Sequence, residues 1–185
     1  MQPEDLPGFL DFLREAGRLK KERRRGWVVK VKVTDAESVA DHSWRTALMA
    51  LILGGSRGLD TQRMTAMALI HDLSEAVTGD LTPEDEQDPR RKRELADEAF
   101  QRLLSLLPAP MRSNLALLWQ EYQQSTTEEA QLVRELDKVE MALQAEEYGR
   151  EGYNKAALAE FLSHSERSVR DRELIQLLHV LRGAS

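Results

Sequence analysis

Residues 61–80 read TQRMTAMALIHDLSEAVTGD. Apolar side chains recur through this stretch at helical spacing, at Met64, Met67, Ile70, Leu73 and Val77. The pattern predicts a helix from Thr61 to Val77, with Gly79 as its stop. His71 and Asp72 interrupt the apolar run, and an imidazole or a carboxylate is costly to bury unless it is paired or binds a metal ion. The stretch therefore predicts a core helix that carries two polar groups in need of a partner.

Helical spacing and capping residues continue towards the N-terminus. An amphipathic helix is predicted from Leu6 to Leu19, ending near the basic run that follows. Thr34 and Glu37 have the spacing of a capping box, which predicts that a second helix starts there and ends among the glycines at 54, 55 and 58. The segment WVVKVKV at 27–33 alternates in part and is rich in Val, so it is predicted to be a short extended segment.

Four more segments with apolar spacing follow towards the C-terminus. They lie at 95–107, 115–122, 127–148 and 155–181, the last with room for one or two helices. Pro108 and Pro110 separate the first two. Thr82 followed by Pro83 is typical of an N-cap with proline at the first helical position, and the charged stretch from Glu84 to Glu94 is predicted to be a mobile loop or a helix edge.

The whole pattern predicts an all-α fold, a single compact domain of about six or seven helices over residues 1–185. At 185 residues the chain has the usual size of one domain. A hydrophobic share of 41%, with six Pro and ten Gly, fits a packed helical protein rather than a disordered one. The residues that carry motifs lie between 8 and 148, and helices at 155–182 complete the predicted domain.

Charge and cysteine content limit the partners and the metal chemistry. The 32 acidic and 26 basic residues give a formal charge of -6, so no overall attraction to nucleic-acid polymers or membranes is expected. The absence of Cys excludes disulfides and thiolate ligands, so any metal must be bound by imidazole and carboxylate. No stretch approaches membrane-spanning length and the first residues lack the pattern of a secretory signal, so a cytoplasmic protein is expected.

Two more polar residues fall at predicted core positions. His42 lies on the second predicted helix, and Asp137 borders the apolar stripe of the helix at 127–148. With His71 and Asp72 they offer two imidazoles and two carboxylates from three helices. This mixture of ligands suits borderline divalent metals such as Mn, Co, Ni, Zn or Fe(II).

Each of these four residues also has an ordinary structural explanation. A His on an apolar face is usually a hydrogen-bonded core residue, and an isolated His-Asp pair often arises by chance. Asp137 could be angled to solvent, or paired with Arg134 or Lys138. Only the combination of the four points to a metal site.

Four short motifs strengthen that combination. They are RRGW at 24–27, ESVADH at 37–42, HDLSEAVTGD at 71–80 and Leu136-Asp137. Together the matches run from Gly8 to Tyr148 and resemble the HD-domain metal-dependent phosphohydrolases, most closely their 5′-deoxynucleotidase branch. The metal motif of that superfamily is a His, a His-Asp pair and a distant Asp. The branch adds an R-x-G-W, an acidic-Ser/Asn-Val-Ala/Ser-acidic-His segment and an HD-x-x-E-x-x-x-G-D run.

The resemblance implies one divalent metal ion bound by His42, His71, Asp72 and Asp137, with its remaining positions open to water and phosphate. Such an ion lowers the pKa of a bound water and holds a phosphoryl oxygen as a Lewis acid. Ligand type alone does not fix its identity, so Mn, Co, Ni, Zn, Fe and Mg all stay open.

Glu75 and Asp80 match two acidic residues of the branch. The resemblance implies that Glu75 orients or deprotonates the attacking water and that Asp80 protonates the leaving ribose oxygen. The ordinary alternatives are a solvated Glu on a helix surface and an Asp that caps the turn after Gly79.

Arg24 matches the Arg of the branch that grips the 5′-phosphate, a contact suited to a guanidinium fork. Because Arg24 lies within the run KKERRR, Arg23 or Arg25 could take its place. The run could instead be a solvated helix end or a weak nucleic-acid patch. Trp27 could pack against the base or sugar of a substrate, or be a buried structural residue.

Glu37 and Asp41 each have two explanations. Glu37 completes the predicted capping box with Thr34, or it lies near His42 and supports the metal site or faces the substrate. Asp41 holds the free nitrogen of a ligand His, or lies on the surface. The sequence leaves both choices open.

The resemblance implies hydrolysis of a small-molecule substrate, a (deoxy)nucleoside 5′-monophosphate, through attack of a metal-bound water. A first alternative keeps the metal site but takes another small phosphate ester or a cyclic or polyphosphorylated nucleotide, because spacing does not read the sugar or base. A second is a helical regulatory module that keeps a metal only for stability, and Glu75 and Asp80 argue against it. Members of the family are often dimers, so the resemblance leaves a homodimer open.

Overall fold

The computed structural model of the chain describes residues 2–82 and 85–184, which contain helices and no strand. The prediction of an all-α fold is confirmed. The described residues form nine α-helices, more than the sequence predicted. These are α1 (Leu6–Ala16), α2 (Val39–Ser56), α3 (Thr61–Ile70), α4 (Glu75–Thr78), α5 (Pro89–Leu106), α6 (Ala109–Gln124), α7 (Glu128–Arg150), α8 (Lys155–Ser168) and α9 (Arg172–Ala184). Short 3-10 turns at Pro3–Asp5 and Gly17–Lys20 flank α1.

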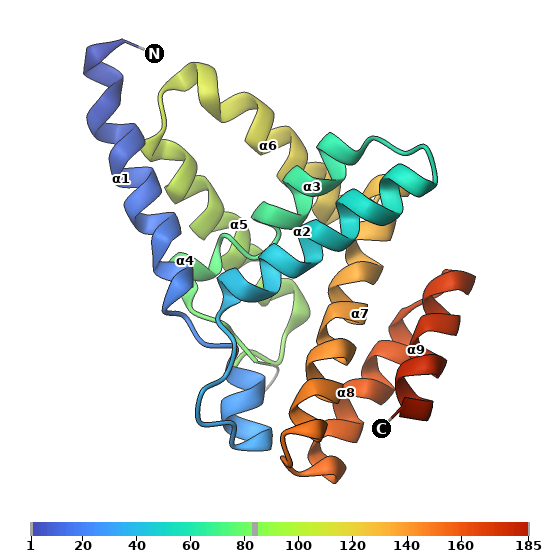
Figure 1. Ribbon diagram of the computed structural model, residues 1–185. Helices are drawn as coiled ribbons and strands as arrows, with labels where there is room; N and C mark the ends of the chain where they lie inside the picture. The colour runs from blue at the N-terminus through green and yellow to red at the C-terminus, as the bar shows by residue number, and fades with distance from the viewer. Residues whose placement is uncertain (1, 83–84, 185) are drawn as a thin grey trace.

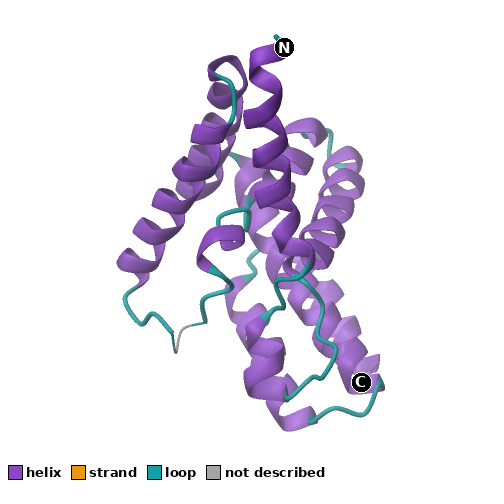
Figure 2. Ribbon diagram, turned by 90° about the vertical axis from the view of Figure 1, so that its left-hand side faces the viewer, coloured by secondary structure: helices purple, strands orange, loops and turns teal. Residues whose placement is uncertain are grey.

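The helices are arranged around α2, α3 and α7. α2 and α3 lie side by side, and both pack against α7. Figure 1 shows α1 and α5 on the left of this centre, with α6 above, and α8 and α9 on the lower right, where they pack on α7. Figure 2 shows the helices joined at their ends by loops. The arrangement brings α2, the end of α3 and the middle of α7 together in the interior.

The main hydrophobic core forms between α2, α3, α5, α6 and α7. Met64, Met67 and Phe100 are fully buried there. Phe100 stacks on Trp119 with 4.2 Å between the ring centroids, which fixes α5 against α6. Each large apolar side chain buried in this way contributes about 1.5–3 kcal/mol to the free energy of unfolding. This packing holds the helices that carry the polar residues described below.

Gly54 explains the close approach of α2 and α3. A Cβ atom at this position would lie 2.6 Å from Sδ of Met64, which is fully buried. A larger residue would therefore push the two helices apart. α2 ends at Ser56, among the glycines that predicted its end.

Two sequence-based expectations about the whole chain stay predictions. No helix among the described residues is long and apolar enough to cross a lipid bilayer. The cytoplasmic location and the single domain over residues 1–185 both remain expectations, although α8 and α9 pack directly on α7.

The prediction of an extended segment at 27–33 is wrong. Trp27–Val31 forms a π-helical turn, which the N–H of Lys32 closes by donating to the Trp27 carbonyl. The N–H of Val33 donates to the same carbonyl at 3.1 Å. Trp27 and Val31, four residues apart, are both buried. Trp27 packs between Tyr148 of α7 and Phe161 of α8, with ring centroids 5.4 Å and 4.1 Å away. These tertiary contacts override the β preference of the Val residues.

The prediction of one continuous helix from Thr61 to Val77 is also wrong. α3 ends at Ile70, a tight turn follows, and α4 begins at Glu75. On a continuous helix, His71 and Asp72 would point about 100° apart. Because a turn replaces the helix here, both side chains can point toward the same position in the interior of the protein. The turn includes hydrogen bonds from Leu73 N to Ile70 O and from Glu75 N to Asp72 O, each 3.0 Å long.

The capping box predicted at Thr34 and Glu37 lies one turn later. Ser38 is the N-cap of α2, and its hydroxyl accepts from Asp41 N at 3.1 Å while the Asp41 carboxylate accepts from Ser38 N at 2.9 Å. Asp41 therefore caps α2, and Glu37 is free for another role. Thr127 caps α7, accepting from Ala130 N at 3.2 Å, so this helix begins where its apolar repeat predicted.

The charged stretch after Asp80 is only partly helical. The predicted N-cap pair includes Pro83, which lies outside the described residues, as does Glu84. Thr82 donates its hydroxyl to Asp85 at 2.7 Å. α5 begins at Pro89 after the N-cap Asp88, so residues 89–94 are helical rather than part of a loop.

Candidate active site

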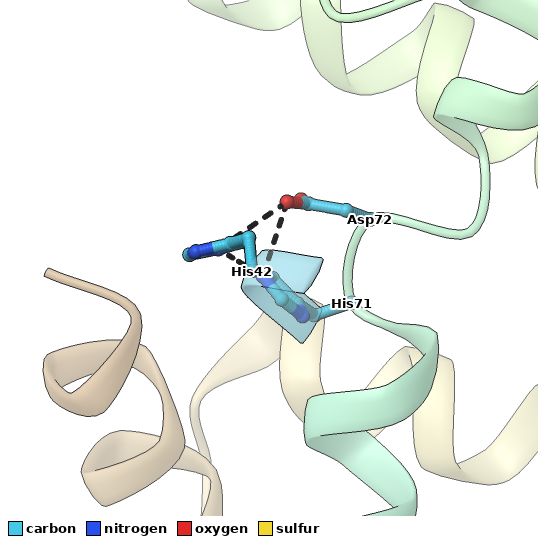
Figure 3. Close-up of side chains that lie close together, drawn as sticks. All are labelled: His42, His71 and Asp72. Carbon is cyan, nitrogen blue, oxygen red and sulfur yellow. Dashed lines mark hydrogen bonds and ion pairs between the residues drawn. The ribbon is translucent and has the colours of Figure 1, made fainter. Parts of the chain in front are cut away.

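The four residues predicted as metal ligands meet in the interior. His42 comes from the first turn of α2, His71 and Asp72 from the turn after α3, and Asp137 from the middle of α7. His42 Nε2 lies 3.1 Å from His71 Nε2, 3.6 Å from an Asp72 oxygen and 3.3 Å from an Asp137 oxygen. Figure 3 shows His42, His71 and Asp72 pointing toward one another.

The chemistry of these donors fits a divalent metal ion. His42 is fully buried, and His71 and Asp137 are 4% and 8% exposed. Burial alone would raise the pKa of Asp72, but His71, His42 and Arg24 hold it well below its ordinary value. Asp72 is therefore ionised at neutral pH, close to two imidazole nitrogens that face each other. Two imidazoles with two carboxylates are a ligand set used for Zn, Mn, Fe and similar ions.

A carboxylate that the sequence did not single out orients His42. Glu140 of α7 is fully buried, and its carboxylate contacts His42 Nδ1. Arg45 of α2 donates to the same carboxylate from Nε at 2.8 Å and from Nη2 at 2.7 Å. On its other side Arg45 donates to Gln144 at 2.6 Å and to Glu147 at 2.8 Å. The contact directs Nε2 of His42 toward the other ligand residues.

The sequence left open whether Asp41 holds the free nitrogen of a ligand His. In the structure, Glu140 contacts that nitrogen of His42. Asp41 is exposed and occupied by the capping box. A sequence signal for Glu140 does exist: it lies three residues after Asp137, next to the buried Val139 on α7. The ring of His71 is held differently, because its Nδ1 donates to the Ala68 carbonyl at 2.7 Å.

Arg24 is the arginine of the KKERRR run that faces the four ligand residues. Its side chain is only 14% exposed, and Nη1 lies 3.3 Å from the Asp72 carboxylate. Arg23 instead donates to the Ala36 carbonyl at 2.7 Å, and Arg25 donates to Asp85 at 3.0 Å. The two neighbours therefore have structural partners outside the site.

Trp27 and Glu37 contact each other next to Arg24. Trp27 is 1% exposed, and its indole N–H donates to the Glu37 carboxylate at 2.9 Å. The same Glu37 oxygen lies 3.9 Å from Nε of Arg24. Burial raises the pKa of Glu37 to about 7, and Glu140 acts in the same direction while Arg24 opposes it. Trp27 is thus largely a buried structural residue, and Glu37 orients both Trp27 and Arg24.

Glu75 and Asp80 lie close to Asp72 and to Arg24. Among the described residues, Oε2 of Glu75 is buried without a hydrogen-bond partner. Burial raises the pKa of Glu75 well above its ordinary value, and the charges of Asp72 and Asp80 raise it further. Asp80 accepts from the backbone N–H of Arg25 at 2.7 Å, and burial raises its pKa as well. An unpartnered buried carboxyl group marks a position where a water or ligand would complete the hydrogen bonding.

A cavity of about 700 Å³ opens beside these residues. Among its lining residues are six of the predicted site residues: Arg24, Trp27, Asp72, Glu75, Asp80 and Asp137. Lys92, whose ammonium group contacts the Leu81 carbonyl, also lines it. Phe161, His164 and Arg167 of α8 line it as well. The sequence assigned no role to Lys92 or to these three residues of α8, because none of them belongs to a motif.

Comparison with known proteins identifies the family of the chain. The family model described as an HD domain matches residues 16–176. The chain belongs to the HD-domain family. Mouse 5′-deoxynucleotidase HDDC2 is 37% identical to this HD domain over 174 residues, which cover 94% of this chain and 86% of the mouse protein. The human protein of the same name is likewise 37% identical, over 94% of this chain and 84% of its own length.

Solved structures share the fold of this HD domain. A conserved hypothetical protein from Pyrococcus furiosus is 32% identical with a TM-score of 0.76, over 94% of this chain and 98% of that one. The cyanophage S-2L HD phosphohydrolase DatZ, solved with dA and one catalytic Zn2+ ion, has a TM-score of 0.60 over 90% of this chain and 91% of its own. DatZ is 22% identical, so the likeness concerns the fold.

Proposed function

We propose that this HD domain is a metal-dependent phosphohydrolase that releases phosphate from nucleoside 5′-monophosphates, with 2′-deoxynucleotides as the preferred class. The observation that carries the proposal is the meeting of His42, His71, Asp72 and Asp137 beside a cavity that also contains Arg24 and Glu75. Relatives named 5′-deoxynucleotidase at 37% identity support the substrate class.

The four ligand residues would hold one divalent metal ion. When bound, the ion supplies Lewis acidity, which lowers the pKa of a water and neutralises charge on a phosphoryl group. Its identity among Mn, Co, Ni, Zn, Fe and Mg is set by geometry and availability more than by ligand type. Glu140 would keep the ring of His42 in the orientation that binding requires.

The remaining side chains act on the substrate. Arg24, held beside Asp72 and Glu37, binds phosphate oxygens through its guanidinium fork. Glu75 orients the attacking water and takes its proton, since its raised pKa makes it a stronger base than an exposed Glu. Water adds to phosphorus, the P–O5′ bond breaks, and Asp80 gives a proton to the departing O5′. The products are a nucleoside and inorganic phosphate.

The test is phosphate release from a panel of ribo- and deoxyribonucleoside 5′-monophosphates by protein loaded with each metal in turn. We expect turnover of the deoxynucleotides, and Glu75→Gln should lose about 100-fold or more of kcat while keeping its metal. Glu98→Gln changes an exposed glutamate of α5 in the same way and should have parental activity. Absence of phosphate release with every metal and nucleotide would overturn the proposal.

Two other functions keep part of the same structure. The cavity of about 700 Å³ has room for a phosphate ester other than a nucleoside 5′-monophosphate, and the same panel extended to cyclic and polyphosphorylated nucleotides separates the two. A regulatory module with a structural metal would have no use for the unpartnered carboxyl group of Glu75. Turnover that disappears in Glu75→Gln would exclude that module.

We also infer that the protein forms a homodimer through an exposed face of α2. Trp44, Leu48, Leu51 and Ile52 recur on one side of this helix and are 64%, 40%, 50% and 61% exposed. A row of large apolar side chains in contact with water is typical of an interaction surface. Because one α2 face can pair with the same face of a second copy, two-fold symmetry would cover both.

A further inference from the structure

One part of the cavity lining, the basic wall, gathers basic side chains from three separate elements. Lys30 comes from the π-helical turn, Lys138 from α7, and His164 and Arg167 from α8. All four line the cavity. His164 and Arg167 are three residues apart on α8, so they lie on one face of that helix. Glu160, one turn before His164, is the acidic residue that α8 contributes to the lining.

This wall is fixed in place next to the ligand residues. Ser165 of α8 donates its hydroxyl to the Lys138 carbonyl at 2.7 Å, which pins α8 to α7 beside Asp137. Lys138 Nζ lies 2.8 Å from the Asp137 carboxylate. The basic wall therefore begins next to the ligand residues and continues along α8.

Two side chains of α8 lack a partner in the part of the chain that the structure describes. Among residues 2–82 and 85–184, no hydrogen bond or ion pair engages the ring of His164 or the guanidinium group of Arg167. Burial lowers the pKa of His164, and the positive charges of Lys138, Arg167 and Lys30 lower it further, against the opposing charge of Asp137. The field at this wall is thus positive, and a field of that sign attracts an anionic group more than a neutral base.

We propose that His164 and Arg167, with Lys138 and Lys30, form a binding site for a second phosphate of the substrate. The inference rests on the proposed function and names its substrate class more closely. A 2′-deoxynucleotide has a single free hydroxyl on its sugar, at the 3′ position, so a second phosphate on the sugar must stand there. The substrate class is therefore a 2′-deoxynucleoside 3′,5′-bisphosphate.

The chemistry of the reaction is unchanged by this second group. Water adds to the 5′ phosphorus, the P–O5′ bond breaks, and O5′ receives a proton. The 3′-phosphate stays attached and is held by the basic wall while the 5′-phosphate leaves. The products are a deoxynucleoside 3′-phosphate and inorganic phosphate.

The test compares kcat/KM for a deoxynucleoside 3′,5′-bisphosphate with that for the matching 5′-monophosphate, in metal-loaded protein. We expect the bisphosphate to be favoured by roughly tenfold, the usual worth of one good charge-assisted contact. In Arg167→Ala and in His164→Ala the ratio should fall towards one. Arg172→Ala removes the same charge from α9, outside the cavity lining, and should keep the parental ratio.

The outcomes separate this inference from the proposed function. If monophosphates are hydrolysed but the bisphosphate is not preferred, or if Arg167→Ala and Arg172→Ala have the same ratio, the second-phosphate site is wrong and the proposed function stands. If neither nucleotide is hydrolysed, the proposed function fails. Calorimetric titration of both nucleotides into metal-loaded Glu75→Gln protein then decides the site alone. Tighter binding of the bisphosphate supports it, and equal binding overturns it.

Discussion

Each ligand side chain in the interior is held by a neighbour, and the neighbours differ in how well the sequence reveals them. His42, His71, Asp72 and Asp137 could be selected from the sequence because a polar residue in an apolar run is an anomaly. Glu140 was not selected, although it lies one helical turn after Asp137, because a Glu on a long charged helix is usually solvated. Its burial depends on the packing of α2 against α7, which no local pattern reports.

Removing the charge of Glu140 should weaken metal binding without unfolding the protein. In Glu140→Gln the imidazole of His42 loses its carboxylate partner, so metal affinity should fall by about 10–100-fold. Competition with a chromophoric chelator measures the affinity. Glu147→Gln makes the same change on the half-exposed outer side of Arg45 and serves as the control. Equal affinities in the two variants would mean that Glu140 does not position His42.

Metal affinity should also rise with pH. Burial and Arg24 lower the pKa of His42, but Glu140 and Asp137 outweigh them and raise it to about 9 in the metal-free protein. A metal must therefore displace a proton from this ring at neutral pH. Affinity is expected to increase roughly tenfold per pH unit from pH 7 towards 9 and to level off above. An affinity that is constant over this range would contradict the assignment of His42 as a ligand.

At the scale of single elements, the sequence located helices better than the joints between them. The helix over 127–148 was predicted from its apolar repeat, and α7 spans Glu128–Arg150. The break after Ile70 was missed, because residues 61–77 keep a helical repeat through the turn. The positions of His71 and Asp72 depend on that break, so the local pattern fails at a functionally important turn.

An ion pair between elements should make a small, pH-dependent contribution to stability. Arg57, just after α2, donates to both carboxylate oxygens of Asp171, just before α9, at 2.8 Å and 2.9 Å. Because the hydrogen bonds from Arg57 lower the pKa of Asp171, its contribution is complete above the unfolded pKa of about 4 and is lost as pH falls through the folded pKa. Asp171→Asn should cost at most about 1 kcal/mol at pH 7, since both groups are partly exposed.

Urea denaturation at pH 7 and again near pH 3 checks this expectation. The difference in free energy of unfolding between parent and Asp171→Asn should shrink at the lower pH. Asp35→Asn removes a carboxylate that pairs with Arg23 and is almost fully exposed, so it should change stability little at either pH. A difference that grows on acidification would have the wrong sign for a lowered pKa.

On the scale of the whole molecule, the fold class followed from composition and periodicity, whereas the arrangement of the helices did not. An apolar repeat indicates that a helix has a hydrophobic face, but it does not indicate which neighbouring helix packs against that face. Leu48 and Leu51 belong to the apolar pattern of the second helix, yet both are exposed in the structure. Their exposure is what makes the face of α2 a candidate contact between two copies.

Replacing Trp44 by Lys should convert the proposed homodimer to a monomer. A charge within an apolar interface leaves an unpaired ammonium group in each copy, which costs several kcal/mol of association energy. Light scattering after size-exclusion chromatography measures the mass. Leu117→Lys introduces the same charge at a residue of α6 that is 63% exposed, and should leave the dimer intact. A parent protein that elutes as a monomer would refute the dimer.

The convergence of α2, α3 and α7 on one point has a mechanical consequence. His42 and His71 are 29 residues apart in the sequence, and His42 and Glu140 are 98 apart. An ion bound by these segments would therefore cross-link distant parts of the chain. An ion present at a hundred times its Kd adds about 2.7 kcal/mol to the free energy of unfolding. Removal of the metal by a chelator should therefore lower the melting temperature. It should also speed hydrogen exchange, most strongly at the amides of α3 and of the turn that follows it. The concentration of available metal would then determine the lifetime of the folded protein.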